Sequence, residues 1–164
     1  MTEIAQTGRV SILNFYERRA RRLLPALLVV ILASLPFAWR YLLPEQLVSF
    51  SKSLVYSLLF TSNFFWHFSQ QQYGADSALL QPFLHTWSLA VEEQYYILFP
   101  LLVLVIYKWG RQYLAGILSF ILVLSLLFAQ WMTGRDTSFS FYMMPTRFWE
   151  LLAGSLLALV VLNN

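Results

Sequence analysis

Long apolar stretches dominate this chain and limit the folds that it can adopt. The 164 residues are 59% hydrophobic and only 12% charged, which is about half the charged share of a soluble domain. A helix needs about 20 apolar residues to cross roughly 30 Å of hydrocarbon, and backbone polar groups must be satisfied within it. We therefore predict an all-α, polytopic transmembrane helical bundle. Its membrane segments, about five, fall at residues 23–43, 47–68, 84–107, 113–132 and 146–162.

Basic residues flank these segments and bear on their topology. Basic clusters tend to face the cytoplasm. One cluster precedes the first segment, and Lys108 and Arg111 lie between the third and fourth. Three full crossings would put the clusters on opposite sides, so either one segment is re-entrant or interfacial, or one cluster departs from the rule. We expect the second segment, the most polar of the five, to be re-entrant or interfacial. The first cluster consists of Arg18, Arg19, Arg21 and Arg22.

A histidine and two adjacent carboxylates begin the third segment. An ionised acid at membrane depth costs roughly 2.5 to 3.5 kcal/mol on insertion scales and so indicates a functional site. Because imidazole can accept a hydroxyl proton and a carboxylate can orient it, we predict acid–base chemistry or substrate positioning by His85, Glu92 and Glu93. The alternative is a polar stripe that joins packed helices by hydrogen bonds.

Helical geometry places several polar side chains of this segment together. At 100° per residue one face carries His85, Ser88, Glu92 and Tyr96. We expect that face to point into the bundle or into a water-filled cavity. His85 and Glu92 are two turns apart, roughly 10 Å along the axis, so they are too far apart for a direct hydrogen bond.

The other charged groups allow several interpretations. The arginine cluster is either a topology signal or an anion site for a phosphorylated carrier, the nucleotide of coenzyme A or anionic lipid. Arg147 and Glu150, at i and i+3, predict a local ion pair at the membrane border. We expect no nucleic-acid partner, because the basic residues flank spans, and no metal site, because the chain has no cysteine and only two histidines.

Three blocks of the sequence resemble the acyltransferase 3 family of bacterial integral membrane acyltransferases, which modify envelope sugars. The blocks are residues 14–27 (NFYERRARRLLPAL), 82–102 (PFLHTWSLAVEEQYYILFPLL) and 145–159 (PTRFWELLAGSLLAL). They occur in the family's order and with similar spacing. The resemblance implies a membrane O-acyltransferase that moves an acyl group, commonly acetyl, from acyl-coenzyme A to a sugar hydroxyl of a cell-envelope polysaccharide, either lipopolysaccharide O-antigen or peptidoglycan.

The resemblance also implies partners and a location. Acyl-coenzyme A is the co-substrate and no cofactor is bound. The acceptor is an envelope polysaccharide or a lipid-linked sugar. Membrane lipid surrounds a multi-pass protein of the bacterial inner membrane.

The family's motifs match individual positions. Its R-x-x-R element matches Arg19 and Arg22, with Arg18 and Arg21 as an overlapping copy, and implies binding of the donor's phosphates. Its H-T-W-S-L-x-V-E-E-Q signature includes His85, Glu92 and Glu93, for which we predict catalytic roles. The matches for which we predict structural or substrate-positioning roles are Trp87, Ser88, Gln94, Arg147 and Glu150.

The chain departs from the family in two respects. Members carry in their first span an arginine and a histidine at a fixed spacing, and that histidine is the proposed base. At this spacing before His67 and His85 stand Tyr56 and Gly74. The chain also begins where the family's second span normally ends and stops before the usual set of helices is complete.

We therefore interpret residues 1–164 as a partial membrane acyltransferase domain. Residues 1–22 are its cytoplasmic start, with the arginine cluster, and residues 23–164 form the helical membrane segments. Two rival interpretations stay open. One is a transporter or flippase, whose acids relay protons while the arginines hold an anionic lipid-linked substrate. The other is a truncated product without activity.

Overall fold

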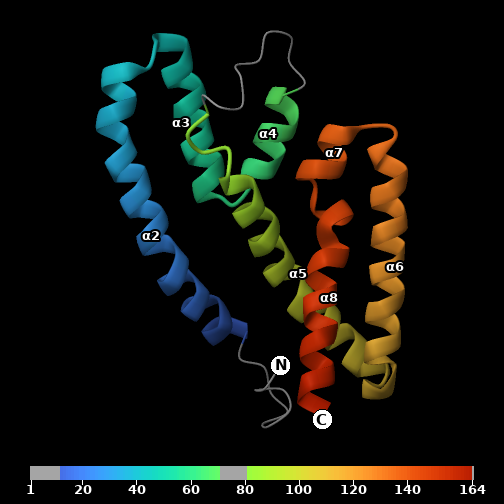
Figure 1. Ribbon diagram of the computed structural model, residues 1–164. Coiled ribbons are helices and arrows are strands. Elements are labelled where there is room, and N and C mark those ends of the chain that lie inside the picture. The colour runs from blue at the N-terminus through green and yellow to red at the C-terminus, as the bar shows by residue number, and fades with distance from the viewer. Residues whose placement is uncertain (1–11, 71–80, 164) are drawn as a thin grey trace.

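The computed structural model describes residues 12–70 and 81–163, and within these ranges every regular element is a helix (Figure 1). The predicted all-α bundle is therefore confirmed. In chain order the α-helices are α2 (Ile12–Tyr41), α3 (Pro44–Leu58), α4 (Ser62–Gln70), α5 (Thr86–Trp109), α6 (Leu114–Thr133), α7 (Thr137–Tyr142) and α8 (Met144–Asn163), and a short 3-10 turn, η2 (Arg111–Tyr113), precedes α6.

Four stretches of the described chain are long and apolar enough to cross a membrane. They are Asn14–Tyr41, Thr86–Lys108, Leu114–Thr133 and Thr137–Val161. Large apolar side chains are exposed along them, such as Val29, Phe120 and Val161. Lipid tails would cover such surfaces, because an apolar face of this size is rarely left to water.

The second predicted segment folds as a hairpin of two short helices. By the helical rise, α3 and α4 are about 22 Å and about 13 Å long, too short to cross the hydrocarbon layer. Between them Phe60 has a φ of 53°, and the Thr61 N–H donates to the Tyr56 carbonyl at 2.9 Å. Figure 1 shows α3 descending from the end of α2 to mid-height and α4 returning toward the same end. None of the four candidate spans among the described residues includes this hairpin, in agreement with the expectation that the second segment does not cross.

The hairpin also resolves the topology conflict. Because the hairpin does not cross, the start of α2 and the junction of α5 with α6 lie at the same end of the molecule (Figure 1). The arginine cluster and Lys108 are therefore at one end. α2 begins at Ile12, earlier than the predicted residue 23, so the arginines lie on its first turns instead of ahead of it.

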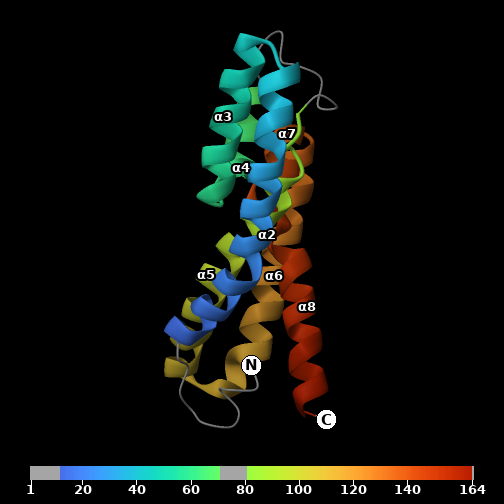
Figure 2. The ribbon, with the colours of Figure 1, turned by 90° about the vertical axis from the view of Figure 1, so that its left-hand side faces the viewer.

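Two hydrophobic clusters hold the helices in place. The first packs α2 and the hairpin, with Phe50, Trp66 and Phe83 at its centre. The second joins α5, α6 and α8 (Figures 1 and 2). Its buried members are Tyr95, Val103, Ile106, Leu114, Leu118 and Leu152. At the α6–α8 contact, the Ser125 hydroxyl donates to the Pro145 carbonyl at 2.6 Å and accepts the Trp149 N–H at 3.1 Å.

Candidate functional site

Three successive residues of α5 contact three different parts of the molecule. Because neighbouring positions of a helix differ by 100° in direction, Glu92, Glu93 and Gln94 point to different sides. Glu92 lines a pocket against α8, Glu93 pairs with α2 and Gln94 bonds to the turn between α3 and α4. α5 is thus the element around which the candidate site is built.

Glu93 forms an ion pair with Arg19 across the gap between α5 and α2. The Arg19 Nη2 lies 2.8 Å from Glu93 Oε1, and Arg19 Nε donates to the same oxygen at 3.2 Å. The two side chains are 24% and 12% exposed. The Arg19 guanidinium also lies 3.3 Å from the centroid of the Tyr96 ring, an arrangement that adds a cation–π attraction. The pairing neutralises both charges and lets them lie at low solvent exposure.

A tyrosine of α2 supports the same crossing. The Tyr16 hydroxyl lies 3.2 Å from the Ile97 carbonyl and 3.4 Å from that of Tyr96. Pro100 of α5 has no N–H to donate to the Tyr96 carbonyl four residues before it, so that carbonyl can accept from such a donor. The first and second sequence blocks therefore meet at this crossing.

Gln94 holds the hairpin turn. Its Nε2 donates to the Phe60 carbonyl at 3.0 Å and to Asn63 Oδ1 at 2.9 Å, and Asn63 Nδ2 donates back to Gln94 Oε1 at 3.5 Å. A second link lies nearby, where the buried hydroxyls of Ser57 and Thr86 are 2.8 Å apart. The end of the hairpin is therefore fixed to the first turns of α5 by buried polar contacts.

Glu92 faces a pocket that two sequence blocks build together. The pocket has a volume of about 160 Å³. Arg147 Nη1 pairs with Glu150 Oε1 at 2.8 Å, as predicted, and its Nε donates to the Phe141 carbonyl at 3.3 Å. The Arg147 guanidinium lies 5.2 Å from the Trp87 ring centroid. The lining residues are Trp87, Ser88, Val91, Glu92, Arg147, Glu150 and Leu151.

The four other predicted site residues lie apart from this pocket. His85 is exposed at the residue before α5, its ring 6.4 Å from that of Phe83, and its carbonyl accepts the Ser88 hydroxyl at 3.1 Å. Arg18, Arg21 and Arg22 are exposed on the first turns of α2. Of the face predicted on α5, Ser88 and Glu92 do line a pocket, whereas Tyr96 turns to Arg19.

Sequence reasoning missed several polar residues that fix this arrangement. Neither Asn63 nor His67 was among the predicted site residues. His67 is buried, and its Nδ1 lies 3.0 Å from the Ser138 hydroxyl, which joins α4 to α7. The high content of serine, asparagine and histidine in residues 47–68 was the available signal. Among the described residues no cluster of histidine and acidic side chains could hold a metal ion.

Comparisons with known proteins give relatives over nearly the whole chain. The O-acetyltransferase OatA of Staphylococcus aureus (strain NCTC 8325) is 30% identical over 164 residues, which is 98% of this chain and 27% of that protein. The peptidoglycan O-acetyltransferase OatA of Listeria monocytogenes is 33% identical over 98% of this chain and 26% of its own length. An uncharacterized protein of Haemophilus influenzae is 32% identical, with 97% of this chain and 67% of that protein aligned.

The match covers nearly all of this chain but only part of the two OatA proteins. The chain spans about a quarter of the length of the two OatA proteins. No family model matches it, and no solved structure does so either.

Proposed function

Since this chain belongs to the family of membrane O-acyltransferases that includes the OatA O-acetyltransferases, as a partial counterpart of those longer proteins, we propose that it transfers an acetyl group from acetyl-coenzyme A to a sugar hydroxyl of a bacterial envelope polysaccharide. Peptidoglycan is the proposed acceptor, because the Listeria relative is named for it. Lipopolysaccharide O-antigen appears in the name of none of these three relatives. The proposed location is the cytoplasmic membrane, with both basic clusters on the inner side.

The observation that carries this proposal is the pocket in front of Glu92. Ser88 and Glu92 come from the second sequence block, and Arg147 and Glu150 from the third, yet all four line one pocket. Within residues 12–70 and 81–163 Glu92 makes no ion pair, and its side chain is exposed to the pocket. A carboxylate in this setting is available to a hydroxyl-bearing ligand.

The proposed chemistry is attack of the sugar oxygen on the thioester carbonyl. The C–O bond forms as the hydroxyl proton passes to a base, and the C–S bond then breaks to release the thiolate of coenzyme A. Glu92 is the proposed proton acceptor. Arg147 is the proposed donor to the oxyanion, since a positioned guanidinium stabilises charge that develops in the transition state. His85, exposed one turn before Ser88, stays a predicted catalytic residue.

The arginines of α2 divide between two proposed tasks. Arg19 is engaged by Glu93, so we assign this pair to positioning α2 against α5. Arg18 and Arg22 are exposed on the same helix and are the proposed ligands of the donor's phosphates, which guanidinium groups bind in a bidentate manner. Arg21 pairs with Glu17 at 2.7 Å on the surface and stays a predicted donor ligand.

Transfer of labelled acetyl tests this function. Membranes that contain the protein are incubated with labelled acetyl-coenzyme A, and alkali-labile label in the polysaccharide is measured. We expect label with the wild type and with Glu17→Gln, a matched control on the exposed part of α2, and a loss of at least about 100-fold with Glu92→Gln, as for removal of a general base. Equal activity of Glu92→Gln and wild type would contradict the assignment of Glu92. Absence of label together with transport by proteoliposomes without acyl-coenzyme A would favour the transporter.

A further inference from the structure

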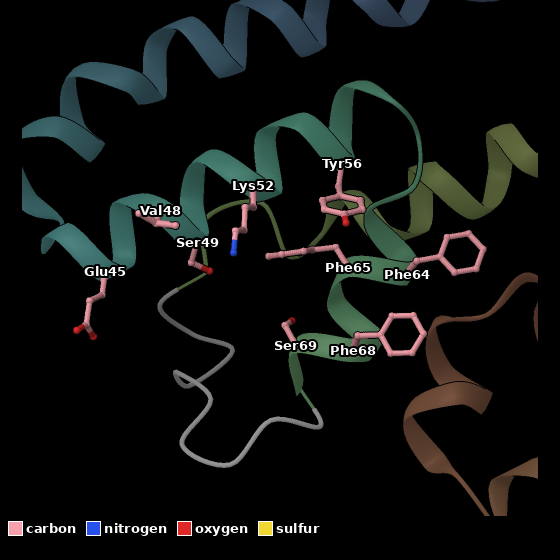
Figure 3. A pocket seen from close by; sticks show the side chains of 9 residues that line it. All are labelled: Glu45, Val48, Ser49, Lys52, Tyr56, Phe64, Phe65, Phe68 and Ser69. Carbon is pink, nitrogen blue, oxygen red and sulfur yellow. The ribbon is translucent and has the colours of Figure 1, made fainter.

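A second, larger pocket lies inside the hairpin, between α3 and α4. Its volume is about 570 Å³. Figure 3 shows the two helices facing each other across it, with the Lys52 ammonium directed into the space and the Phe65 ring extending toward Lys52. Ser49 and Ser69 border it from α3 and α4 (Figure 3). The described residues that line it are Glu45, Val48, Ser49, Lys52, Tyr56, Phe64, Phe65, Phe68 and Ser69.

The lining combines hydrogen-bonding groups with aromatic faces. Lys52 donates, Glu45 accepts, and the hydroxyls of Ser49, Tyr56 and Ser69 do both. The rings of Tyr56 and Phe65 stack at 5.1 Å with an angle of 27° between their planes, and so present a flat apolar surface. Pockets of this volume that combine apolar and aromatic side chains with a few polar groups are typical of small-ligand sites.

The charge balance distinguishes between the two substrates. Among the described residues that line the pocket, one is a cation and one is an anion, so this part of the lining offers no excess positive charge for the phosphates of coenzyme A, which favour clustered arginines. A pyranose ring instead carries many hydroxyls, which need both donors and acceptors, and apolar C–H faces, which need flat surfaces. A membrane-facing aromatic belt would account for Phe64 and Phe68, but it does not account for Lys52, Glu45 and two serines beside them.

The position of the pocket fits the same assignment. In Figure 1 the hairpin occupies the end of the molecule opposite the arginine cluster. Its inner end is tied to α5, because Asn63, just before Phe64 and Phe65, bonds to Gln94, next to Glu93. α4 also bonds to α7 through His67 and Ser138, and Phe141 of α7 accepts from Arg147. The helices that line the hairpin pocket are thus bonded to α5 and α7, and these contact or form part of the Glu92 pocket.

We infer that the hairpin pocket binds a sugar unit of the acceptor polysaccharide, with Lys52 and the serines on its hydroxyls and the Tyr56–Phe65 pair against its ring. This inference rests on the proposed function, since it supplies the acceptor side of that reaction. It also separates the two substrates in space. The donor's phosphates bind near the first turns of α2, and the sugar binds at the opposite end.

Binding of a defined oligosaccharide tests the inference without any turnover. The protein in lipid nanodiscs is titrated with a β-1,4-linked N-acetylhexosamine tetrasaccharide, followed by saturation-transfer NMR, and separately with coenzyme A. The variants are Lys52→Met and Phe65→Leu. Their matched controls are Lys108→Met at the other end of the molecule and Phe120→Leu on the exposed face of α6.

We expect each hairpin variant to weaken tetrasaccharide binding by about tenfold, the effect of losing one good contact, and to leave coenzyme A binding unchanged. The two controls should bind the sugar as the wild type does. Because Phe65 also packs against Trp66, Lys52→Met is the decisive variant if Phe65→Leu folds poorly. Wild type that does not bind the tetrasaccharide, or Lys52→Met that binds it equally well, would overturn the inference.

The same variants separate this inference from the proposed function. If Lys52→Met transfers acetyl with an unchanged KM for the acceptor, the proposed acyltransferase function is supported and the sugar site in the hairpin is contradicted. Sugar binding that depends on Lys52, in membranes that transfer no acetyl, would support the hairpin site and count against the acyltransferase.

Discussion

The two ion pairs that border α5 have the same chemistry and different surroundings. Arg19 and Glu93 are 74 positions apart, belong to two helices and are 24% and 12% exposed. Arg147 and Glu150 are one turn apart on α8 and are 26% and 42% exposed. Removing Arg19 leaves Glu93 at 12% exposure without its partner, whereas removing Arg147 leaves Glu150 at 42% exposure, where water reaches it. We therefore expect the first pair to matter for stability and the second for ligand chemistry.

The largest loss of stability is expected from breaking the interhelical pair. Arg19→Met leaves Glu93 without its partner, and we expect a loss of about 2 to 3 kcal/mol, below the range for fully buried pairs because both groups keep some exposure. Thermal unfolding in detergent measures it. The double variant Arg19→Met with Glu93→Leu should regain most of the loss. If Arg19→Met alone is as stable as the wild type, the interhelical pair does not matter more for stability than the pair on α8.

A smaller loss is expected from the amide that holds the hairpin. Gln94→Leu removes the donors to Phe60 and Asn63, and an unsatisfied buried polar group costs about 1 to 3 kcal/mol. Hydrogen exchange should rise mainly at residues 59–63. The exposed Gln112→Leu on η2 serves as the matched control. Unchanged exchange in the turn of Gln94→Leu would show that packing alone fixes the hairpin.

A change in the Arg147–Glu150 pair should lower acetyl transfer much more than it lowers stability. Arg147→Lys keeps the charge but loses the planar guanidinium that lies 5.1 to 5.2 Å from the Phe141 and Trp87 rings. We expect less than about 1 kcal/mol of destabilisation and at least about tenfold less acetyl transfer, since Lys does not replace Arg at a stacked site. Denaturation and transfer assays on one preparation measure both. A loss of stability equal to that of Arg19→Met would contradict this contrast.

The smallest effect is expected at the surface of α2. Arg21 and Glu17 are 79% and 52% exposed and form an i, i+4 pair, which contributes about 0.3 to 0.5 kcal/mol in a helix. Arg21→Ala should therefore leave the midpoint of thermal unfolding close to wild type. A strong loss of transfer, with the midpoint unchanged, would support Arg21 as a donor ligand, whereas transfer close to wild type would contradict that role.

Much of the fold followed from sequence because lipid restricts the options. Composition predicted a helical bundle. The basic clusters around residues 18–22 and 108–111 indicated that one segment does not cross or that one cluster departs from the rule, and polarity favoured the second segment as the one that does not cross. Relatives aligned over 97 to 98% of the chain confirm the family suggested by its three blocks. The first membrane segment was predicted from residue 23, whereas α2 already begins at Ile12, because charged helical turns have no apolar pattern that marks where the helix begins.

The tertiary partners of the candidate site were beyond such reasoning. Helical periodicity showed that Glu92 and Glu93 point in different directions, but it carries no information on which helix faces each one. His67 and Ser138 meet across 71 positions of chain, and no local pattern pairs them. The positive φ of Phe60 was equally hidden, because a phenylalanine rarely adopts it and the bonds that stabilise the turn come from Gln94.

The divergence of Glu92, Glu93 and Gln94 fixes the rotational setting of α5. Turning this helix about its axis by one residue step would bring Glu93 to the pocket and Gln94 to Arg19, exchanging a carboxylate for an amide at the ion pair. Each of the three neighbours therefore accepts only one angular position. A one-residue insertion between His85 and Glu92 would rotate the α5 residues before it by about 100° relative to Glu92, Glu93 and Gln94. The helix could then keep the contacts made before the insertion or the contacts of these three residues, but not both.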